Sequence, residues 1–180
     1  MNRNKIIGKK VVLRPIEMSD APRFVVWLND PAVNKFVLKR SITLNEEQKW
    51  IRSLKKAKKT EHHFAIDTNK GVHVGSIALF VKIPNQMATF GILIGDKNYW
   101  NKGYGTDATK TILEYGFNRL KLHRIQLEVY KYNPRAIRVY KKLSFKLEGI
   151  RRQSNLYKGT FYDDLIMGIL KSEWKKINKK

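Results

Sequence analysis

The chain has 180 residues, with 37 basic and 15 acidic side chains and a formal net charge of +22. The lack of cysteine excludes disulfides and thiol catalysis, and the four histidines form no HxH or HExxH pattern, so we expect no metal site. No apolar run approaches the roughly 18 residues of a membrane span, and no secretory signal follows the basic N-terminus. We expect one cytoplasmic domain over residues 1–180, with no membrane partner.

The first half of the chain predicts two helices and several strands. Ser19 and Asp20 are expected to cap a helix that carries Pro22 in its first turn and stops before Pro31. A capping box at Thr43–Glu46 opens the second helix. Short turns between the later strands predict an antiparallel meander. The expected strands are Val11–Pro15, His63–Asp67, Val72–Ile83 and Met87–Ile94.

The second half alternates helices with strands. Helices are expected at Gly103–Arg119 and Pro134–Leu143, with a strand at Arg124–Val129 between them. Two closing strands, Lys146–Leu156 and Thr160–Ile169, meet at a short turn. A strand–helix–strand crossover makes the centre of the sheet locally parallel, so the predicted fold class is α+β.

The positive charge favours polyanionic partners such as RNA, ribosomes or a polyphosphate cofactor. Lysine-rich surfaces also arise without any such partner, and here the lysines are scattered along the chain. The dense stretches at 55–59 and 175–180 are typical of a solvated helix end and a tail. We therefore predict a basic C-terminal tail over about 172–180.

A glycine motif lies in the segment Trp100–Thr106, between a predicted strand and a helix. Gly103 and Gly105 would let the backbone approach an anion at the helix N-terminus, and Lys102 adds charge. Taken alone, a tight turn that needs positive φ is the more common explanation of such glycines. A Walker A loop is excluded because no Gly-Lys-Ser/Thr follows, and Ala108 disfavours a dinucleotide fingerprint.

A second motif begins thirty residues later with Asn133, a good N-cap, and Pro134, a good first helical residue. Ile137, Tyr140 and Leu143 share one helix face. An ordinary amphipathic helix with Tyr140 in the core would show the same pattern.

Together these motifs resemble the GNAT superfamily of acyl-CoA N-acyltransferases, and within it the RimJ/RimL-like branch. The resemblance covers nearly the whole chain and implies a mostly antiparallel sheet of about seven strands, two of them splayed apart, flanked by about four helices. The matching segments are Leu13–Pro15 with Ser19–Asp20, Trp27–Val33, Tyr99–Ala108, Asn133–Phe145, and Gly159 with Asp163.

The resemblance implies that acetyl-CoA is the co-substrate. The cofactor residues it implies are the backbone of Ile92, Leu93 and Ile94 for the pantetheine arm; Lys102, Gly103, Tyr104, Gly105 and Thr106 for the pyrophosphate; and Asn133, Ala136 and Lys142. Asn133 would bond the pantetheine or the adjacent backbone, Ala136 would leave room for the cofactor, and Lys142 would reach its phosphates or face solvent. Tyr140 would protonate the leaving thiolate.

Two positions depart from the family pattern. Thr89 stands where the branch often carries an acid, which leaves a strand-borne general base in doubt. Ser144 replaces the usual glycine before Phe145, a change expected to affect a turn.

The expected reaction is direct attack of an amine on the thioester in a ternary complex, with a backbone N–H near Leu93 steadying the oxyanion. The helices between Ser19 and Lys59 would build the acceptor pocket, with the candidate substrate-binding residues Trp27, Asn29, Asp30, Phe36 and Trp50.

Candidate acceptors are a protein N-terminus, including that of a ribosomal protein, an amino sugar or sugar nucleotide, an aminoglycoside and a polyamine. The +22 charge disfavours the polycations, although a few local carboxylates would reverse that ranking. The alternative is a basic RNA- or ribosome-binding module that keeps this scaffold without turnover. A homodimer is compatible with the closing strands.

Overall fold

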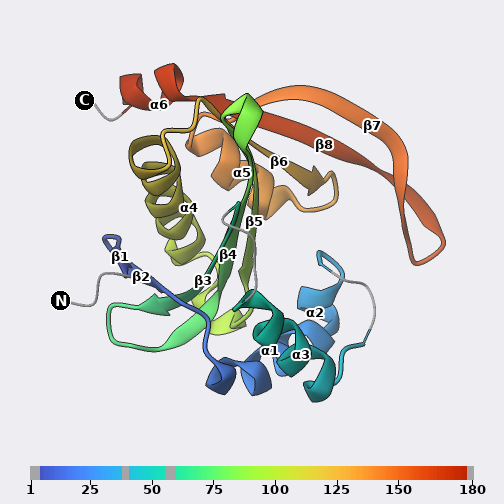
Figure 1. The fold of residues 1–180 in the computed structure, drawn as a ribbon. Coiled ribbons are helices and arrows are strands. Elements are labelled where there is room, and N and C mark those ends of the chain that lie inside the picture. Colours follow the sequence, from blue (N-terminus) through green and yellow to red (C-terminus); the bar gives the residue numbers. More distant parts are fainter. Residues whose placement is uncertain (1–4, 38–40, 56–59, 178–180) are drawn as a thin grey trace. The chain divides into compact units, whose positions relative to one another are not determined.

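The computed structural model of the protein describes residues 5–37, 41–55 and 60–177. These residues form eight strands and six α-helices, where about seven strands and about four helices were expected. The strands make one mixed sheet in the order β1-β2-β3-β4-β5-β6-β8-β7 (Figure 1). The chain divides into an N-terminal unit, within 1–79 and 92–112, and a C-terminal unit, within 80–91 and 113–180.

The strands of the first half are close to those predicted. In addition, a two-residue strand precedes Val11–Arg14. Gly8 lies in the turn between the two strands, where an added Cβ would collide with Thr111 and Asp107. Nothing in the local sequence announces so short a strand. The observed strands are β1 (Ile6–Ile7), β2 (Val11–Arg14), β3 (Glu61–Thr68), β4 (His73–Lys82) and β5 (Met87–Ile94).

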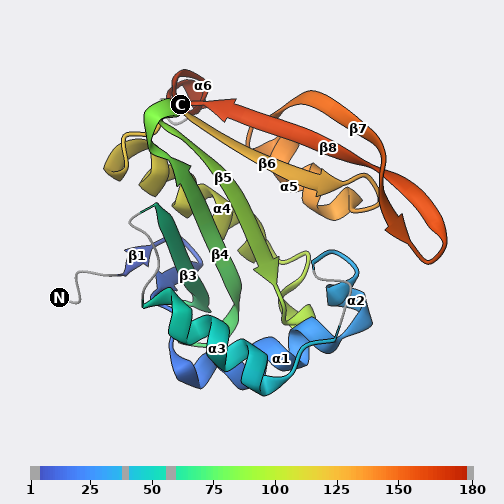
Figure 2. The ribbon, with the colours of Figure 1, turned by 45° about the vertical axis from the view of Figure 1, so that its right-hand side comes forward.

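The helices α1 (Ala21–Asn29), α2 (Pro31–Asn34) and α3 (Leu44–Leu54) lie together in the N-terminal unit (Figure 2). The capping box of α3 is confirmed, since the Thr43 side chain accepts from the Glu46 N–H and the Glu46 carboxylate accepts from the Thr43 N–H. These helices share an apolar core. Its buried members are Ala21, Phe24, Trp27, Leu28, Val33, Ile42 and Ile51.

Asp20 occupies the predicted N-cap position of α1, with Pro22 in the first turn, but the expected side-chain cap bond is absent. Asp20 precedes the helix in a helical conformation and makes no side-chain cap bond. Its carboxylate instead accepts two bonds from the Arg14 guanidinium and one from the Glu17 N–H. Arg14 on β2 competes successfully for the carboxylate, because the guanidinium donates two charge-assisted bonds where a cap would supply one.

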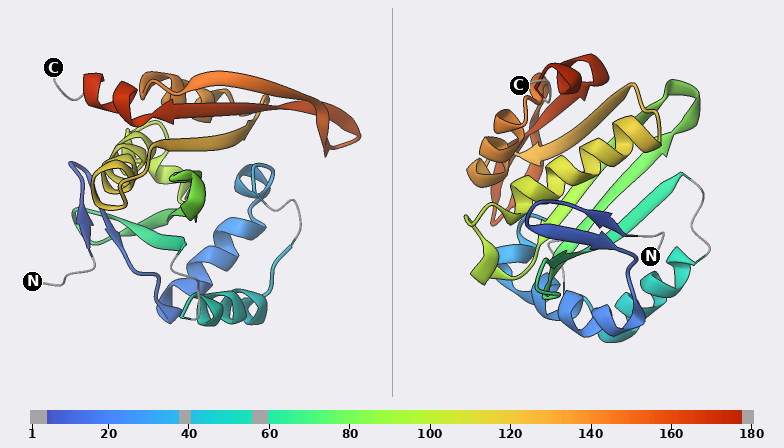
Figure 3. Two further views of the ribbon diagram at one scale, coloured as in Figure 1. Left: turned by 45° about the horizontal axis from the view of Figure 1, so that its top comes forward. Right: turned by 90° about the vertical axis from the view of Figure 1, so that its left-hand side faces the viewer.

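Helix α4 (Tyr104–Glu114) continues into a π-helical turn, Tyr115–Arg119, so the predicted helix holds over its full length. Figure 3 shows the β1–β2 hairpin beside this helix. The contact is made by the Asp107 carboxylate, which accepts from the backbone N–H groups of Lys10 and Val11 at 2.7 and 3.1 Å.

The C-terminal unit contains β6 (Arg124–Tyr130), α5 (Pro134–Lys142), β7 (Lys146–Tyr157) and β8 (Thr160–Leu170). The crossover is confirmed, because β5 and β6 pair in parallel. Their ladder runs from Met87 opposite Arg124 to Thr89 opposite Gln126. Both strands then continue beyond their ladder. The β7–β8 turn is also confirmed, with Lys158 and Gly159 at positive φ.

The predicted C-terminal tail over about 172–180 is wrong for residues 172–177, which belong to α6 (Lys171–Ile177). Trp174 anchors this helix: it is 2% exposed, packs against Phe117 and donates to the Glu114 carboxylate. The burial of this one indole holds the segment as a helix although the residues around it are mostly lysines. Residues 56–59 and 178–180 of the two lysine-rich stretches lie outside the described residues.

The described part of the chain contains no helix with both the length and the apolar character needed to cross a membrane.

Candidate functional site

The loop before α4 contains the glycine motif. Asn101 and Gly103 both have positive φ, 59° and 85°, and the Gly103 carbonyl accepts from the Asp107 N–H at 3.0 Å. The helix therefore starts immediately after Gly103. The predicted turn with positive φ and the predicted helix N-terminus are both present in this one loop.

The first turn of α4 exposes backbone donors. The N–H groups of Tyr104, Gly105 and Thr106 have no acceptor within the helix, because the first turn never has one. Among the described side chains, none accepts a bond from them. The Lys10 ammonium lies close by and donates to the Lys102 carbonyl at 2.9 Å. Open amides, the helix dipole and a nearby cation together make this turn suitable for a phosphate.

Strand β5 has one edge toward β4 and one edge away from it. A Cβ on Gly75 of β4 would come within 2.0 Å of the Leu93 carbonyl oxygen, so the Leu93 carbonyl is directed at β4. Because successive residues of a strand point their polar groups to opposite edges, Ile92 and Ile94 present theirs on the other edge. On this other edge the Ile94 carbonyl already accepts from the Trp100 indole, and the polar groups of Ile92 lie beside it.

Trp100 links the loop to this strand. Its indole N–H donates to the Ile94 carbonyl at 2.6 Å, and its ring packs against the core of α1 and α3. Just beyond, the N–H groups of Gly95 and Asp96 both reach the Val74 carbonyl, at 2.9 and 3.3 Å. A Cβ on Gly95 would lie 2.2 Å from the Trp27 ring, so this position requires glycine.

Two of the predicted acceptor residues have structural roles. Asn29 uses both ends of its amide on the Ile42 backbone, at 2.8 Å each. Asp30 accepts from the Ala32 N–H and pairs with Lys97, and these bonds lower the pKa of its carboxyl. Both side chains hold the chain around α2 in place.

The predicted aromatic residues belong mainly to the core. Trp27 is 8% exposed and stands edge-on to Phe24 and His73, while Trp50 packs against Phe24 and His63. Phe36 follows α2 and lies under the Lys35 ammonium. These aromatic side chains shape the helical layer of the N-terminal unit.

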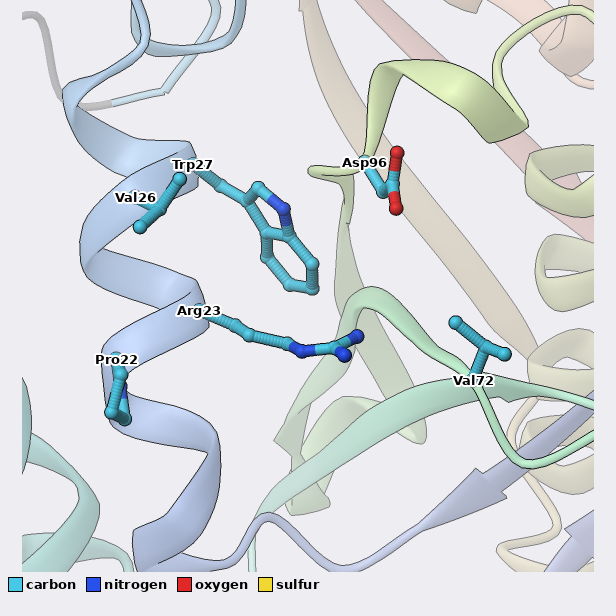
Figure 4. A pocket seen from close by; sticks show the side chains of 6 residues that line it. All are labelled: Pro22, Arg23, Val26, Trp27, Val72 and Asp96. Carbon is cyan, nitrogen blue, oxygen red and sulfur yellow. The ribbon is translucent and has the colours of Figure 1, made fainter.

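A pocket of about 320 Å³ opens in this unit (Figure 4). Its lining shares only Trp27 with the residues predicted from the sequence. Arg23 extends across it from α1 and donates to the His73 carbonyl at 2.7 Å, and Asp96 stands on the facing side. The lining residues are Pro22, Arg23, Val26, Trp27, Val72 and Asp96.

Sequence reasoning missed a buried charge network in the same unit. The Arg14 guanidinium bonds Asp20 at 2.8 Å and Asp67 at 2.7 Å, and the His73 ring reaches Asp20 at 3.2 Å. Bonding to Asp20 raises the pKa of Arg14 despite burial, and burial lowers the pKa of His73. These residues lie on β2, β3 and β4 and directly before α1, and they are too far apart in the chain for a local pattern to reveal them.

Glu47 on α3 is a buried acid with no ion pair among the described residues. It is 3% exposed, and burial raises the pKa of its carboxyl to about 7. Its buried position was not foreseen from the helix pattern.

In the C-terminal unit, Tyr140 lies on α5 and is 7% exposed. Its ring stands edge-on to Phe90 at 5.9 Å and tilted to Phe145 at 5.8 Å. Burial raises the pKa of the phenol, so it stays protonated at neutral pH. The core position and a role as proton donor are therefore compatible in this residue.

The start of α5 is closed by its own cap. The Asn133 side chain accepts from the Ala136 N–H at 3.2 Å, which confirms the predicted N-cap. Ala136 is half-buried, and Lys142 is exposed at the other end of the helix. Ser144 follows at φ 64°, so the substitution for glycine does fall in a turn that favours glycine.

A tyrosine cluster in this unit has no sequence signal. The Tyr132 ring lies parallel between Tyr130 and Tyr157, at centroid distances of 5.2 and 5.4 Å, and Tyr162 stands edge-on at 4.7 Å. The cluster joins the end of β6 to the β7–β8 hairpin. Asp164 of β8 lies beside it and is 8% exposed.

Among residues 5–37, 41–55 and 60–177, no three histidine or acidic side chains gather as metal ligands would.

Comparison with known proteins identifies the class. Residues 10–146 match the family described as "Acetyltransferase (GNAT) domain". The match spans more than half of the chain, and the protein therefore belongs to the GNAT family of acetyltransferases. It is an acyltransferase that uses acetyl-CoA as co-substrate, and the α+β sheet described above is the GNAT fold.

Particular relatives agree with this class. The probable N-acetyltransferase YjcK of Bacillus subtilis (strain 168) is 31% identical over 173 residues, 91% of this chain and 95% of the relative. The spermidine N(1)-acetyltransferase of Escherichia coli (strain K12) is 28% identical, covering 91% and 88%. The fold matches a crystal structure of spermidine N-acetyltransferase from Vibrio cholerae in complex with CoA and spermine, with a TM-score of 0.83 at 23% identity, covering 92% and 98%.

Proposed function

We propose that this enzyme transfers the acetyl group of acetyl-CoA to a primary amine by direct attack in a ternary complex, as a RimJ/RimL-like member of the family. The observation that carries the proposal is the open first turn of α4, where Gly103 at φ 85° precedes amides that no described side chain occupies. That turn is suited to the pyrophosphate of the co-substrate.

The cofactor residues of the proposal are those that the family motifs imply. The N-terminal unit offers the backbone of Ile92 and Ile94 to the pantetheine arm and the amides of residues 103–106 to the pyrophosphate, with Lys102 adding charge. The C-terminal unit offers Ala136, a small half-buried residue on α5, and Lys142 for a phosphate.

The proposed chemistry is a balanced acyl transfer. The acceptor ammonium first loses one proton to solvent. The neutral amine nitrogen then forms a bond to the thioester carbonyl carbon, the carbon–sulfur bond breaks, and the nitrogen releases its second proton to solvent as the amide forms. Tyr140 donates its phenolic proton to the departing sulfur and regains a proton from solvent. Burial keeps the pKa of this phenol above the working pH, so Tyr140 holds the proton that the step requires.

The acceptor is a primary amine: a protein N-terminus such as that of a ribosomal protein, a small-molecule amine or an amino sugar. All three present the same nucleophile, so the transfer chemistry is common to them.

Replacement of Tyr140 tests the proposal. We expect Tyr140→Phe to lower kcat by about 100- to 10,000-fold, the usual range for a lost general acid, with little change in the acetyl-CoA KM. Tyr115→Phe is the matched control, since burial also raises the pKa of that phenol but it lies in the π-helical turn. An unchanged kcat in Tyr140→Phe removes the residue from the mechanism.

Titration calorimetry separates this proposal from the RNA-binding alternative. We expect one acetyl-CoA to bind per chain, with the released thiol measured in the presence of amines. Tight RNA binding that weakens steeply with salt, together with no heat from acetyl-CoA, would favour a scaffold without turnover.

A further inference from the structure

The turn between β1 and β2 is held against the start of α4. One oxygen of the Asp107 carboxylate accepts from the Lys10 N–H at 2.7 Å and from the Val11 N–H at 3.1 Å. An added Cβ on Gly8 would lie 2.4 Å from the Thr111 hydroxyl oxygen, so the turn fits closely against the helix. These contacts give the turn one fixed position on α4.

The backbone of Lys10 is also fixed from a second direction. The Lys10 carbonyl accepts from the Asn69 N–H at 3.1 Å, and the Lys9 carbonyl accepts from the Asn69 side chain at 2.7 Å. Since Asp107 holds the N–H of Lys10 and Asn69 holds its carbonyl, both polar groups of this backbone position are bonded. A side chain carried on a rigid backbone loses less conformational entropy when it binds a ligand.

The Lys10 side chain reaches the glycine loop. Its ammonium donates to the Lys102 carbonyl at 2.9 Å and lies 5.8 Å from the centroid of the Tyr104 ring, within the range of a cation–π contact. An added Cβ on Gly103 would be 3.5 Å from the ammonium nitrogen. A cation from a turn 92 residues away in the chain thus stands beside the residue that precedes α4.

This ammonium has bonding capacity left for a ligand. It carries three N–H donors, and the Lys102 carbonyl takes one of them. Within the part of the chain that the structure describes, no carboxylate pairs with the Lys10 ammonium, and the side chain is exposed. The remaining donors can therefore bind an anion that approaches the loop from solvent.

We infer that Lys10 binds a phosphate group of acetyl-CoA, and that Asp107 positions Lys10 by holding the β1–β2 turn on α4. The inference rests on the proposed function, because it adds a residue from outside the family motifs to the loop proposed for the pyrophosphate. It also gives the two-residue strand β1 a role, since this strand closes the hairpin that brings Lys10 to the loop.

Asp107 acts on the phosphate only through Lys10. Its charge has the same sign as a phosphate, so on its own it would weaken phosphate binding at this helix start. By accepting from the Lys10 and Val11 N–H groups, it fixes a lysine there instead. The two residues should therefore be coupled, and the loss caused by changing Lys10 should shrink once Asp107 no longer holds the turn.

Calorimetric titration of the whole protein with acetyl-CoA tests the role of Lys10. We expect Lys10→Gln to raise the acetyl-CoA Kd about five- to tenfold, the size of one partly exposed charge-assisted bond. Lys9→Gln is the matched control, because Lys9 is also exposed and its replacement removes the same charge from the chain. It should change the Kd by less than about twofold.

Salt and a cofactor analogue show whether a phosphate is involved. The loss in Lys10→Gln should shrink between about 0.05 M and about 0.5 M salt, because salt screens an exposed charge pair. Acetyl-3′-dephospho-CoA locates the phosphate. A loss that persists with this analogue assigns Lys10 to the pyrophosphate, and a loss that disappears assigns it to the 3′-phosphate; both results support the inference.

A double-mutant cycle tests the role of Asp107. In an Asp107→Ala background, Lys10→Gln should raise the Kd by less than about twofold, because the turn is no longer held. Asp107→Asn is the matched second background, since its amide oxygen still accepts from the turn, and there Lys10→Gln should cost as much as in the wild type. An equal loss in the Asp107→Ala and Asp107→Asn backgrounds would show that Asp107 does not position Lys10.

An equal rise in Kd for Lys10→Gln and Lys9→Gln, or a loss in Lys10→Gln that salt leaves unchanged, would overturn the inference while the wild type still binds acetyl-CoA. No binding of acetyl-CoA by the wild type would instead refute the proposed function.

Discussion

Helices α4 and α5 begin in opposite ways, although both follow a strand and both carry a motif of the family. At α5 the Asn133 side chain fills the first turn by accepting from the Ala136 N–H. At α4 Gly103 precedes the helix at φ 85°, and no described side chain accepts from the amides that follow. A helix that supplies its own cap is locally stable, whereas one that lacks a cap has donors left for a ligand. Variants at the start of α5 should therefore lower stability and spare cofactor binding. Variants at the start of α4 should weaken cofactor binding and spare stability.

The start of a third helix, α3, gives the largest expected effect on stability. At α3 the Thr43–Glu46 capping box serves the first turn, and Glu47 beside it is buried with a pKa raised from 4.5 to about 7. The folded protein then binds a proton that the unfolded chain releases between pH 4.5 and 7. Stability contributed by Glu47 therefore falls as pH rises through this window, by at most about 3 kcal/mol.

Glu47→Gln removes this pH dependence. In urea unfolding, we expect the free energy of unfolding of the variant, relative to the wild type, to be higher at pH 8 than at pH 5. Glu46→Gln is the matched control, because glutamine also completes a capping box. The same difference at both pH values would show that Glu47 is not buried in solution.

At α4, Gly103→Ala should raise the acetyl-CoA KM about tenfold, or about 1.4 kcal/mol. A Cβ at positive φ strains the turn and shifts the amides that follow. Gly71→Ala is the control: Gly71 has φ 78° with nothing within 4 Å of a Cβ, so the strain is similar but lies in another turn. A KM equally raised in both variants would show a general loss of folding instead of a cofactor turn.

At α5, Asn133→Ala should cost about 1 kcal/mol of stability through the lost cap, measured by urea unfolding. Asn133→Ser should recover most of that loss because serine also caps helices. If both variants lose the same amount of kcat/KM while only one loses stability, Asn133 contacts the cofactor directly. The start of α5 would then also serve binding.

The far end of α5 gives the smallest effect. Ser144 has φ 64°, where glycine is unstrained, so Ser144→Gly should stabilise the protein by about 0.5 kcal/mol. Ser144→Ala keeps the strain and should give no gain. Thermal unfolding of the wild type and the two variants tests whether Ser144→Gly alone has a raised Tm.

The sequence predicted most elements, because strands and helices follow local patterns. The Thr43 box and the Asn133 cap were read correctly since each bond joins residues three apart. The failures involve distant partners. The Asp20 carboxylate bonds Arg14 instead of capping the helix that follows it. The segment predicted as a tail forms α6 because Trp174 packs against Phe117.

The same reason limited the reading of the site. The glycine turn and Tyr140 lie in local motifs, whereas the direction of the Leu93 carbonyl depends on Gly75 of another strand. Lys10 stands out only once Asp107 of α4 is seen to hold its backbone beside the glycine loop. No spacing rule within the chain marks a side chain that is defined by neighbours distant in the sequence.

The bond from the Trp100 indole to the Ile94 carbonyl has an optical consequence. Indole emission depends on the polarity and hydrogen bonding around the ring, and this ring joins the proposed phosphate loop to the strand edge proposed for the pantetheine arm. Acetyl-CoA binding should therefore change the emission spectrum of the wild type, and Trp100→Phe should lose that change while keeping the signals of Trp27, Trp50 and Trp174. The enzyme thus contains an intrinsic fluorophore for following cofactor binding without a label.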